Sequence, residues 1–291
     1  MHHQPNMLLQ TIFGEAKTFL DNLHNEREEV IRICRDINSH SKKLIFSVHR
    51  ASAHSPNRAV VENHLKILAE KLATLYYGYA QNESYYSYKG TVSNCIEELI
   101  EALLFAYYLA HRTLLLFENL QYIVVFLIQS YNYETKQANE EPLANCIDLL
   151  LFQPEKTPQI DPQNRLQFAH MSNSVFLPGD YFMGIFDFTG ELMRYTITEM
   201  AQRDASSVGI SPDVLGNLQF LRLLYSHVTL LVSKYPHLNV SRGTFTTDKK
   251  QTATLRKKLE VFRQSVEKVE SAICGAAING NEPTMASVEE L

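Results

Sequence analysis

The chain has 291 residues, 45% of them hydrophobic, which is enough to form a substantial core in one large domain or two ordinary ones. Its formal net charge of -5 excludes the overall positive field expected of a protein that binds nucleic acid unaided. The four cysteines match no zinc-binding spacing, so we expect reduced thiols in the core. They are Cys34, Cys95, Cys146 and Cys274.

Apolar residues recur at intervals of three and four along most of the chain, and this period predicts helices. The first predicted helix covers residues 9–53 and ends at the loop 54–57. A second covers residues 61–79, and a third residues 92–114. Their near-heptad spacing favours antiparallel bundle packing. The apolar stretch 102–128 is interrupted by polar residues, so we expect no membrane span and a soluble protein of the cytoplasm or nucleus.

The middle of the chain, residues 130–178, has no sustained period and is predicted to be an irregular insertion or loop with short helical pieces. Helical character resumes after Asp180, the predicted N-cap, and runs to about Arg203. Two more helices are predicted at residues 214–233 and 255–273, and residues 279–291 are predicted to be a disordered tail. We therefore expect an all-α protein, a single domain over residues 1–291, built as a bundle of about six to seven long, largely antiparallel helices.

Four carboxylates stand in two short motifs, in which each pair falls on one stripe of a helix. Glu98 and Glu101 are spaced i,i+3, and Asp187 and Glu191 are spaced i,i+4. From residue 99 to residue 110, Glu101 is the only residue that is neither apolar nor tyrosine, so this helix should be buried nearly all round. Clustered carboxylates in an apolar setting cost several kcal/mol unless a cation neutralises them. A divalent metal is the simplest candidate.

Each acid also has a simpler interpretation. Glu98 by itself is typical of a solvated helix residue, and Asp187 and Glu191 lie on the same stripe as Arg194, with which they can form a structural ion-pair cluster. A di-iron carboxylate bundle requires Glu-x-x-His pairs, and neither motif has a histidine at i+3. Gly184 and Gly190 within a predicted helix indicate close approach of another backbone or a ligand.

The run from Gly179 to Arg194 closely resembles the characteristic helix of the Trax branch of the translin family, in which the position of Asp187 separates Trax from translin. Three further stretches agree with the family in the same order. They are residues 34–50, Glu98-x-x-Glu101-Ala102, and residues 255–281. The resemblance covers most of the chain outside the middle segment.

The resemblance implies an all-helical subunit that joins a translin-like paralogue in a hetero-oligomeric shell. It also implies that this complex cleaves single-stranded RNA with Mg²⁺, for which Mn²⁺ is an alternative ion, and that single-stranded DNA is a further ligand. The family's catalytic and metal-binding acids correspond to Glu98, Glu101, Asp187 and Glu191. We assign Glu101 and Asp187 to direct ligation, and Glu98 and Glu191 to further ligation or to holding water beside the ion. A non-catalytic scaffold subunit of the same complex is the alternative. No membrane partner is expected.

Candidate RNA contacts fall in two places. Arg35, Lys42, Lys43 and Arg50 lie along the first predicted helix, where they can pair with phosphates. The second place is the segment before the first acidic motif, where the family has nucleic-acid-binding residues and where aromatic rings beside a lysine can stack on bases. Its candidates are Tyr86, Tyr88 and Lys89. This segment departs from the more His- and Arg-rich pattern of the family, and packing of these tyrosines is an equal alternative.

Overall fold

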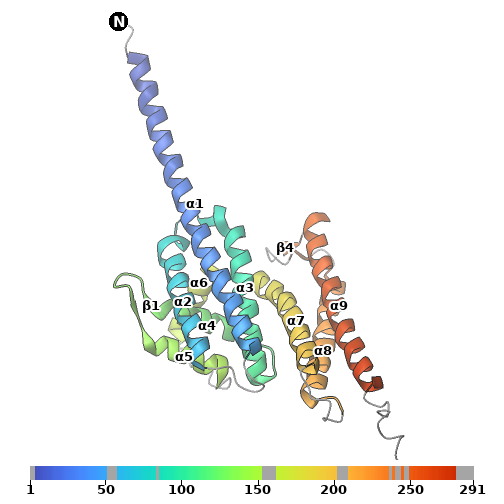
Figure 1. Cartoon of the computed structure of the whole chain (residues 1–291). Helices are drawn as coiled ribbons and strands as arrows, with labels where there is room; N and C mark the ends of the chain where they lie inside the picture. The colour runs from blue at the N-terminus through green and yellow to red at the C-terminus, as the bar shows by residue number, and fades with distance from the viewer. Residues whose placement is uncertain are drawn as a thin grey trace, which may run out of the picture. The chain divides into compact units, whose positions relative to one another are not determined.

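The computed structural model describes residues 4–50, 58–82, 85–152, 162–201, 209–235, 238–239, 244–245 and 249–279. Within these ranges the protein has nine α-helices, one π-helical turn and two pairs of two-residue strands (Figure 1). The predicted all-α fold class is therefore confirmed. Among the described residues, no helix combines the length and apolar character needed to cross a bilayer.

The chain divides into two compact units, Met1–Asp180 and Tyr181–Leu291. The first unit contains α1 (Gln4–Arg50), α2 (Arg58–Leu75), the π-helix η1 (Tyr76–Ala80), α3 (Tyr85–His111), α4 (Phe117–Gln129), the antiparallel strands β1 (Tyr131–Asn132) and β2 (Gln137–Ala138), α5 (Glu140–Leu151) and α6 (Pro162–Val175). The helix α7 (Pro178–Ala201) begins in it and continues in the second unit. The second unit also contains α8 (Pro212–Lys234), β3 (Leu238–Asn239), β4 (Thr244–Phe245) and α9 (Lys249–Asn279).

In the first unit, α1 packs side by side with α2 and α3, and α4 contacts α2, α5 and α6 (Figure 1). Every residue of α3 from Leu99 to Tyr108 is buried, which confirms the prediction that this helix is enclosed nearly all round. Cys34 on α1 and Cys95 on α3 join the two helices through a hydrogen bond between their buried thiols. That bond and burial raise the pKa of Cys95 well above its ordinary value.

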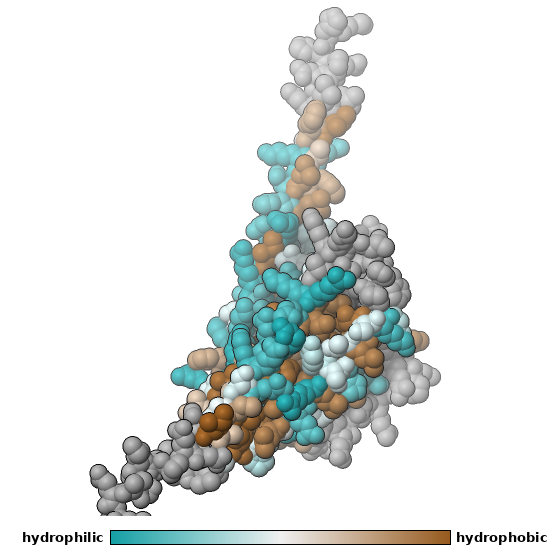
Figure 2. Space-filling view, turned by 90° about the vertical axis from the view of Figure 1, so that its right-hand side faces the viewer, coloured by the Kyte–Doolittle hydropathy of each residue, from teal (hydrophilic) through white to brown (hydrophobic). Residues whose placement is uncertain are grey.

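The N-terminal part of α1 is exposed from residue 11 to residue 22, in contrast to the buried stripe that begins at Val30. This exposed part carries large apolar side chains, and Figure 2 shows them along the helix as brown surface between hydrophilic patches. They are Ile12, Phe13, Phe19 and Leu20, with exposed fractions of 50%, 70%, 63% and 62%. Apolar side chains grouped on one exposed helix are typical of a surface that a partner covers.

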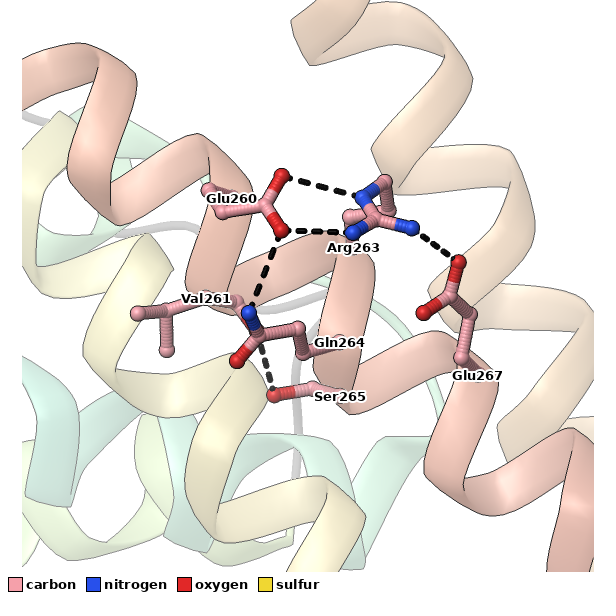
Figure 3. A network of polar contacts seen from close by, with 6 residues as sticks. All are labelled: Glu260, Val261, Arg263, Gln264, Ser265 and Glu267. Carbon is pink, nitrogen blue, oxygen red and sulfur yellow. Dashed lines mark hydrogen bonds and ion pairs between the residues drawn. The ribbon is translucent and has the colours of Figure 1, made fainter.

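In the second unit, aromatic side chains connect the three helices. Phe262 on α9 lies edge-on to Phe186 of α7 and to Tyr225 of α8, with ring centroids 6.2 and 5.4 Å apart. The solvent face of α9 is held by ion pairs of Arg263 with Glu260 and Glu267, drawn in Figure 3. Pairs at i+3 and i+4 of this kind stabilise the helix surface and leave the opposite, apolar face for packing.

Several predictions about local structure require correction. The predicted third helix ends at His111 instead of residue 114, and α4 follows as a separate helix after a short turn in which Arg112 has φ 55°. Residues 130–178 contain the β1–β2 pair, α5 and α6. Four predicted features lie outside the described residues: the end of the first helix beyond residue 50, the loop 54–57, the helix end near residue 203, and the tail beyond residue 279.

Asp180 is not the N-cap of α7, since the helix begins two residues earlier, at Pro178. Its carboxylate accepts hydrogen bonds from the Leu177 backbone N–H, at 2.7 Å, and from the Ser93 hydroxyl of α3. The side chain thus reaches back to the residue before its own helix, as the acid at position N3 of a capping box does. A second correction concerns Cys274, which is exposed on α9, whereas the other three free cysteines are buried as predicted.

Candidate metal and RNA site

The two carboxylates of the acidic pair on α3 differ in burial. Glu101 is only 8% exposed, inside the fully buried run of this helix. Glu98 lies one turn earlier and is more accessible, and its Oε1 is 3.3 Å from Nζ of Lys42 on α1. The apolar pattern of α3 fixes both positions, because the residues that bury this helix leave Glu101 little contact with water.

The acidic pair of α7 is neutralised by two cations. Nζ of Lys258, on α9, donates to Oδ2 of Asp187 at 2.8 Å and to the Met183 carbonyl at 3.4 Å. Glu191, 8% exposed, forms an ion pair with Arg194 on the same helix. The side chain of Arg194 is 67% exposed, so water screens its ion pair with Glu191.

The structural cluster predicted with Arg194 is therefore present in part. Arg194 pairs with Glu191 at the predicted i+3 spacing, whereas Asp187 takes Lys258, which lies 71 residues further along the chain. Sequence spacing alone cannot identify a partner on another helix. The sequence feature that could have indicated this partner is the run Lys257-Lys258, which places a lysine near the start of the apolar stripe of α9.

The two pairs lie in different units of the chain, Glu98 and Glu101 in the first and Asp187 and Glu191 in the second. Within the described part of either unit, no group of three or more His, Cys, Asp or Glu side chains forms a metal-binding cluster. Each unit on its own thus presents a pair of carboxylates on one helix. The assignment of these four acids as catalytic and metal-binding residues stays a prediction.

The expected close approach at Gly190 is not found. A Cβ atom built on Gly190 would have no described atom within 4 Å, so this glycine leaves open space beside Glu191. A glycine in mid-helix costs about 1 kcal/mol relative to alanine, and packing against the described residues does not explain it here. Gly184 is buried, in agreement with a packed position.

The four basic residues predicted along the first helix all lie on α1 and are exposed: Arg35, Lys42, Lys43 and Arg50. Two of them are already engaged. Lys42 pairs with Glu98, and the guanidinium of Arg50 lies 4.7 Å from the centre of the Phe46 ring. Lys42 therefore links the candidate RNA surface to the first acidic pair.

The three residues predicted before the acidic motif lie in the first turns of α3. Tyr88 is buried, and its hydroxyl donates to the Leu23 carbonyl of α1 at 3.4 Å, a geometry that favours packing over base stacking. Lys89 is half-buried, and the side chain of Tyr86 lies outside the described residues. RNA contact by these residues stays a prediction.

Comparison with known proteins finds matches over most of the chain. The model of the "Translin family" matches residues 25–280 of this chain. The chain is 24% identical to the translin-associated protein X of Pongo abelii and of Rattus norvegicus, over 93% of its own length and 79% of theirs. A solved structure, "Crystal structure of AfC3PO", is 20% identical and superposes with a TM-score of 0.49, covering 92% of this chain and 97% of the other.

Proposed function

The chain belongs to the translin family, and on that premise we propose that it is the catalytic subunit of a translin/Trax-type complex. The proposed reaction is endonucleolytic cleavage of single-stranded RNA with a divalent metal, as in the processing of small RNAs or tRNA fragments. The observation that carries the proposal is the burial of Glu101 and Glu191, each 8% exposed, on two helices that also carry a second acid one turn away. Buried carboxylates in pairs are costly to stability and are typical of functional sites.

The residues fit magnesium by their chemistry. All four candidate ligands are carboxylates, the hard oxygen donors that Mg²⁺ prefers, with Mn²⁺ as a substitute. Lys258 and Arg194 stand beside Asp187 and Glu191, so this pair already attracts positive charge. When bound, the metal would polarise a phosphoryl oxygen and neutralise charge that develops in the transition state.

The chain's own residues then have separate roles. Glu101 and Asp187 would hold the ion directly, and Glu98 and Glu191 would complete its shell or orient water. The buried surroundings of Glu101 exclude bulk solvent and strengthen every electrostatic interaction there. Lys42, next to Glu98 and 64% exposed at its side chain, is placed to bind an RNA phosphate.

The partner we propose is a translin-like paralogue in a hetero-oligomer. The exposed apolar side chains on the N-terminal part of α1, Phe13 and Phe19 among them, support it because isolated chains seldom leave such groups in water. With a net charge of -5, RNA affinity would come partly from the partner. Expressed alone, the chain should aggregate or bind RNA weakly.

The decisive experiment is RNA cleavage by the complex reconstituted with a translin-like partner, across a Mg²⁺ titration. Glu101→Gln and Asp187→Asn should each lower cleavage of single-stranded RNA by at least about 100-fold while complex formation persists. Asp187→Asn should also trap uncut RNA, because it removes like charge near the phosphates. Glu260→Gln, the same chemical change on the solvent face of α9, is the matched control. Near-normal cleavage by both site variants would refute the proposed active site.

Substrate form provides a second test. A site approached along helices that bind a strand should accept flexible single strands and reject A-form duplex, whose bases are stacked away from the protein. The measurement is the cleavage rate of one RNA sequence as a single strand and as a blunt duplex. Equal rates would contradict the proposal.

One observation favours a scaffold role as the second candidate. Asp187 and Glu191 are both occupied by cations of the chain itself, as expected of a structural cluster. In that case Asp187→Asn would lower the thermal stability of the complex and leave its metal-dependent cleavage intact. The titration above distinguishes the two functions.

A further inference from the structure

A cleft of about 700 Å³ lies in the first unit between η1, the end of α4 and the β1–β2 hairpin, and none of the four acids lines it. This volume is in the range of small-molecule sites. One wall is the π-helix η1, a rare element that is frequent at functional sites. The opposite wall is the hairpin, whose turn contains Lys136 at φ 54°.

Two tyrosines line this cleft with nearly parallel rings. The rings of Tyr77, on η1, and Tyr133, on the hairpin, are nearly parallel, with an angle of 24° between their planes and 6.2 Å between their centroids. A base can stack on an exposed tyrosine ring, because every base has a π-face. Both rings are accessible, with exposed fractions of 41% and 40%.

Tyr133 lies close to a glycine of η1, Gly78. A Cβ atom on Gly78 would lie 3.3 Å from the Tyr133 hydroxyl, so the absence of a side chain at this position of η1 lets the hairpin tyrosine lie close over the π-helix. Asn132 fixes the hairpin from within, since its Oδ1 accepts from the backbone N–H groups of Glu134 and Thr135 at 3.0 and 2.9 Å. The backbone of η1 at Gly78 and the hydrogen-bonded hairpin turn thus together position the ring of Tyr133.

The polar groups of the cleft are mostly amides. Gln81, Gln129 and Asn139 line it together with Asn132, and Asn139, although it is the N-cap of α5, makes no capping bond with its side chain. Amide side chains offer a donor and an acceptor in one plane, which matches the edge of a purine or pyrimidine. The residues that line the cleft include Glu134 and no lysine or arginine, a composition that disfavours a phosphate.

We propose that this cleft is a nucleobase site, in which a purine or pyrimidine stacks against Tyr77 and Tyr133 and its edge is read by the surrounding amides. The base can come from a free nucleoside or from a single RNA strand that passes the hairpin. The proposal does not rest on cleavage or on the four acids, since neither contributes to the cleft.

The absence of tryptophan from the chain makes a direct test possible. Tyr133→Trp places one fluorophore in the cleft, and its emission should fall saturably when adenosine stacks on it. Ribose 5-phosphate, which lacks a base, should leave the emission unchanged. Oligoadenylate, added in a parallel titration with EDTA present to prevent cleavage, distinguishes the two sources. Quenching by both ligands supports a site open to free bases, and quenching by the oligonucleotide alone supports a site for a strand. Quenching by neither, or equally by ribose 5-phosphate, overturns the proposal.

Substitution of Tyr77 provides the second part of this test. In the Tyr133→Trp background, Tyr77→Ala should weaken binding of the quenching ligand by about 5- to 150-fold, the range of one base–aromatic stack, and Tyr77→Phe should restore it. Tyr235→Ala removes a tyrosine of similar exposure, 36%, outside the cleft and should have no effect.

Equilibrium dialysis of labelled adenosine and labelled oligoadenylate against the wild-type full chain and against Tyr133→Ala checks that the introduced tryptophan did not create the site. Binding of either ligand by the wild-type chain that Tyr133→Ala weakens supports the native cleft. Binding of neither ligand by the wild-type chain, or unchanged binding after Tyr77→Ala or Tyr133→Ala, refutes the proposal.

Discussion

Glu101 on α3 and Glu191 on α7 are equally buried, each 8% exposed, but their surroundings differ. On α3 every residue from Leu99 to Tyr108 is buried, and Lys42 of α1 pairs with the outer acid, Glu98. On α7 both acids have a cation of their own, one from the same helix and one from α9. The spacing of each pair is local, whereas tertiary packing decides how its charge is balanced.

The largest effect should come from the enclosed core of α3. Phe105 is fully buried and lies against His49 of α1, with ring centroids 4.6 Å apart. Phe105→Ala should therefore lower the free energy of unfolding by about 3–5 kcal/mol, through lost burial and the cavity left behind. Phe46→Ala, at a position 58% exposed, is the matched control and should cost about 0.5 kcal/mol. Chemical denaturation of the two variants measures the difference, and similar losses would contradict the enclosure of α3.

The next prediction compares the cations of the two acidic pairs, and it rests on the proposed function. Lys258, 23% exposed, competes with a metal for Asp187, so Lys258→Met should lower the Mg²⁺ midpoint of RNA cleavage by about 3- to 10-fold. Lys42, 64% exposed, is screened by water, and Lys42→Met should change the midpoint by less than about 2-fold. Equal Mg²⁺ midpoints in the two variants would show that Lys258 does not compete with the metal more strongly than Lys42 does.

A third prediction concerns acid stability of the first unit. Burial lowers the pKa of His40 and of His64, which face each other with ring centroids 5.8 Å apart, and the charges of Lys43 and Lys71 act on His40 in the same direction, against Asp36. Because the unfolded chain binds protons more readily than these buried rings, stability should be complete above about pH 6.5 and fall as the pH drops below it.

The measurement is the melting temperature between pH 7.5 and pH 5. His64→Gln removes one titrating ring and should flatten the loss relative to the wild type. Gln keeps a polar side chain beside the Ser47 hydroxyl, which lies 3.3 Å from the His64 ring. A wild-type profile that is flat over this range, or an unchanged slope in the variant, would count against the prediction.

The smallest effect is expected at Arg194. Its side chain is 67% exposed, so its ion pair with Glu191 is screened by water. Arg194→Met should change the free energy of unfolding by at most about 1 kcal/mol. The measurement is thermal denaturation of the variant and the wild type. If the free energy of unfolding fell by several kcal/mol, Glu191 would require Arg194 to balance its charge, as in a buried ion pair, and the prediction would be wrong.

The sequence by itself determined the helices with a long, regular apolar period. The helices α1, α2, α3, α7, α8 and α9 were all predicted as helices, although α3 and α9 begin at Tyr85 and Lys249, well before the predicted starts at residues 92 and 255. The burial of Glu101 was predicted as well, because one acid within a long apolar run is enclosed with its neighbours. The i,i+3 and i,i+4 placement of the acids also follows from local geometry. The helices α4, α5 and α6 were not separated, since they are short and their polar residues hide the period.

Only the tertiary structure decided which distant groups meet. Lys258 reaches Asp187 across 71 residues, and Tyr133 lies over Gly78 and parallel to Tyr77 because the hairpin folds back on η1. No periodicity encodes such contacts, because a helix repeats over 3.6 residues while its neighbours depend on how whole elements pack. The acids of the candidate site were therefore readable from the sequence, and their partners and the aromatic cleft were not.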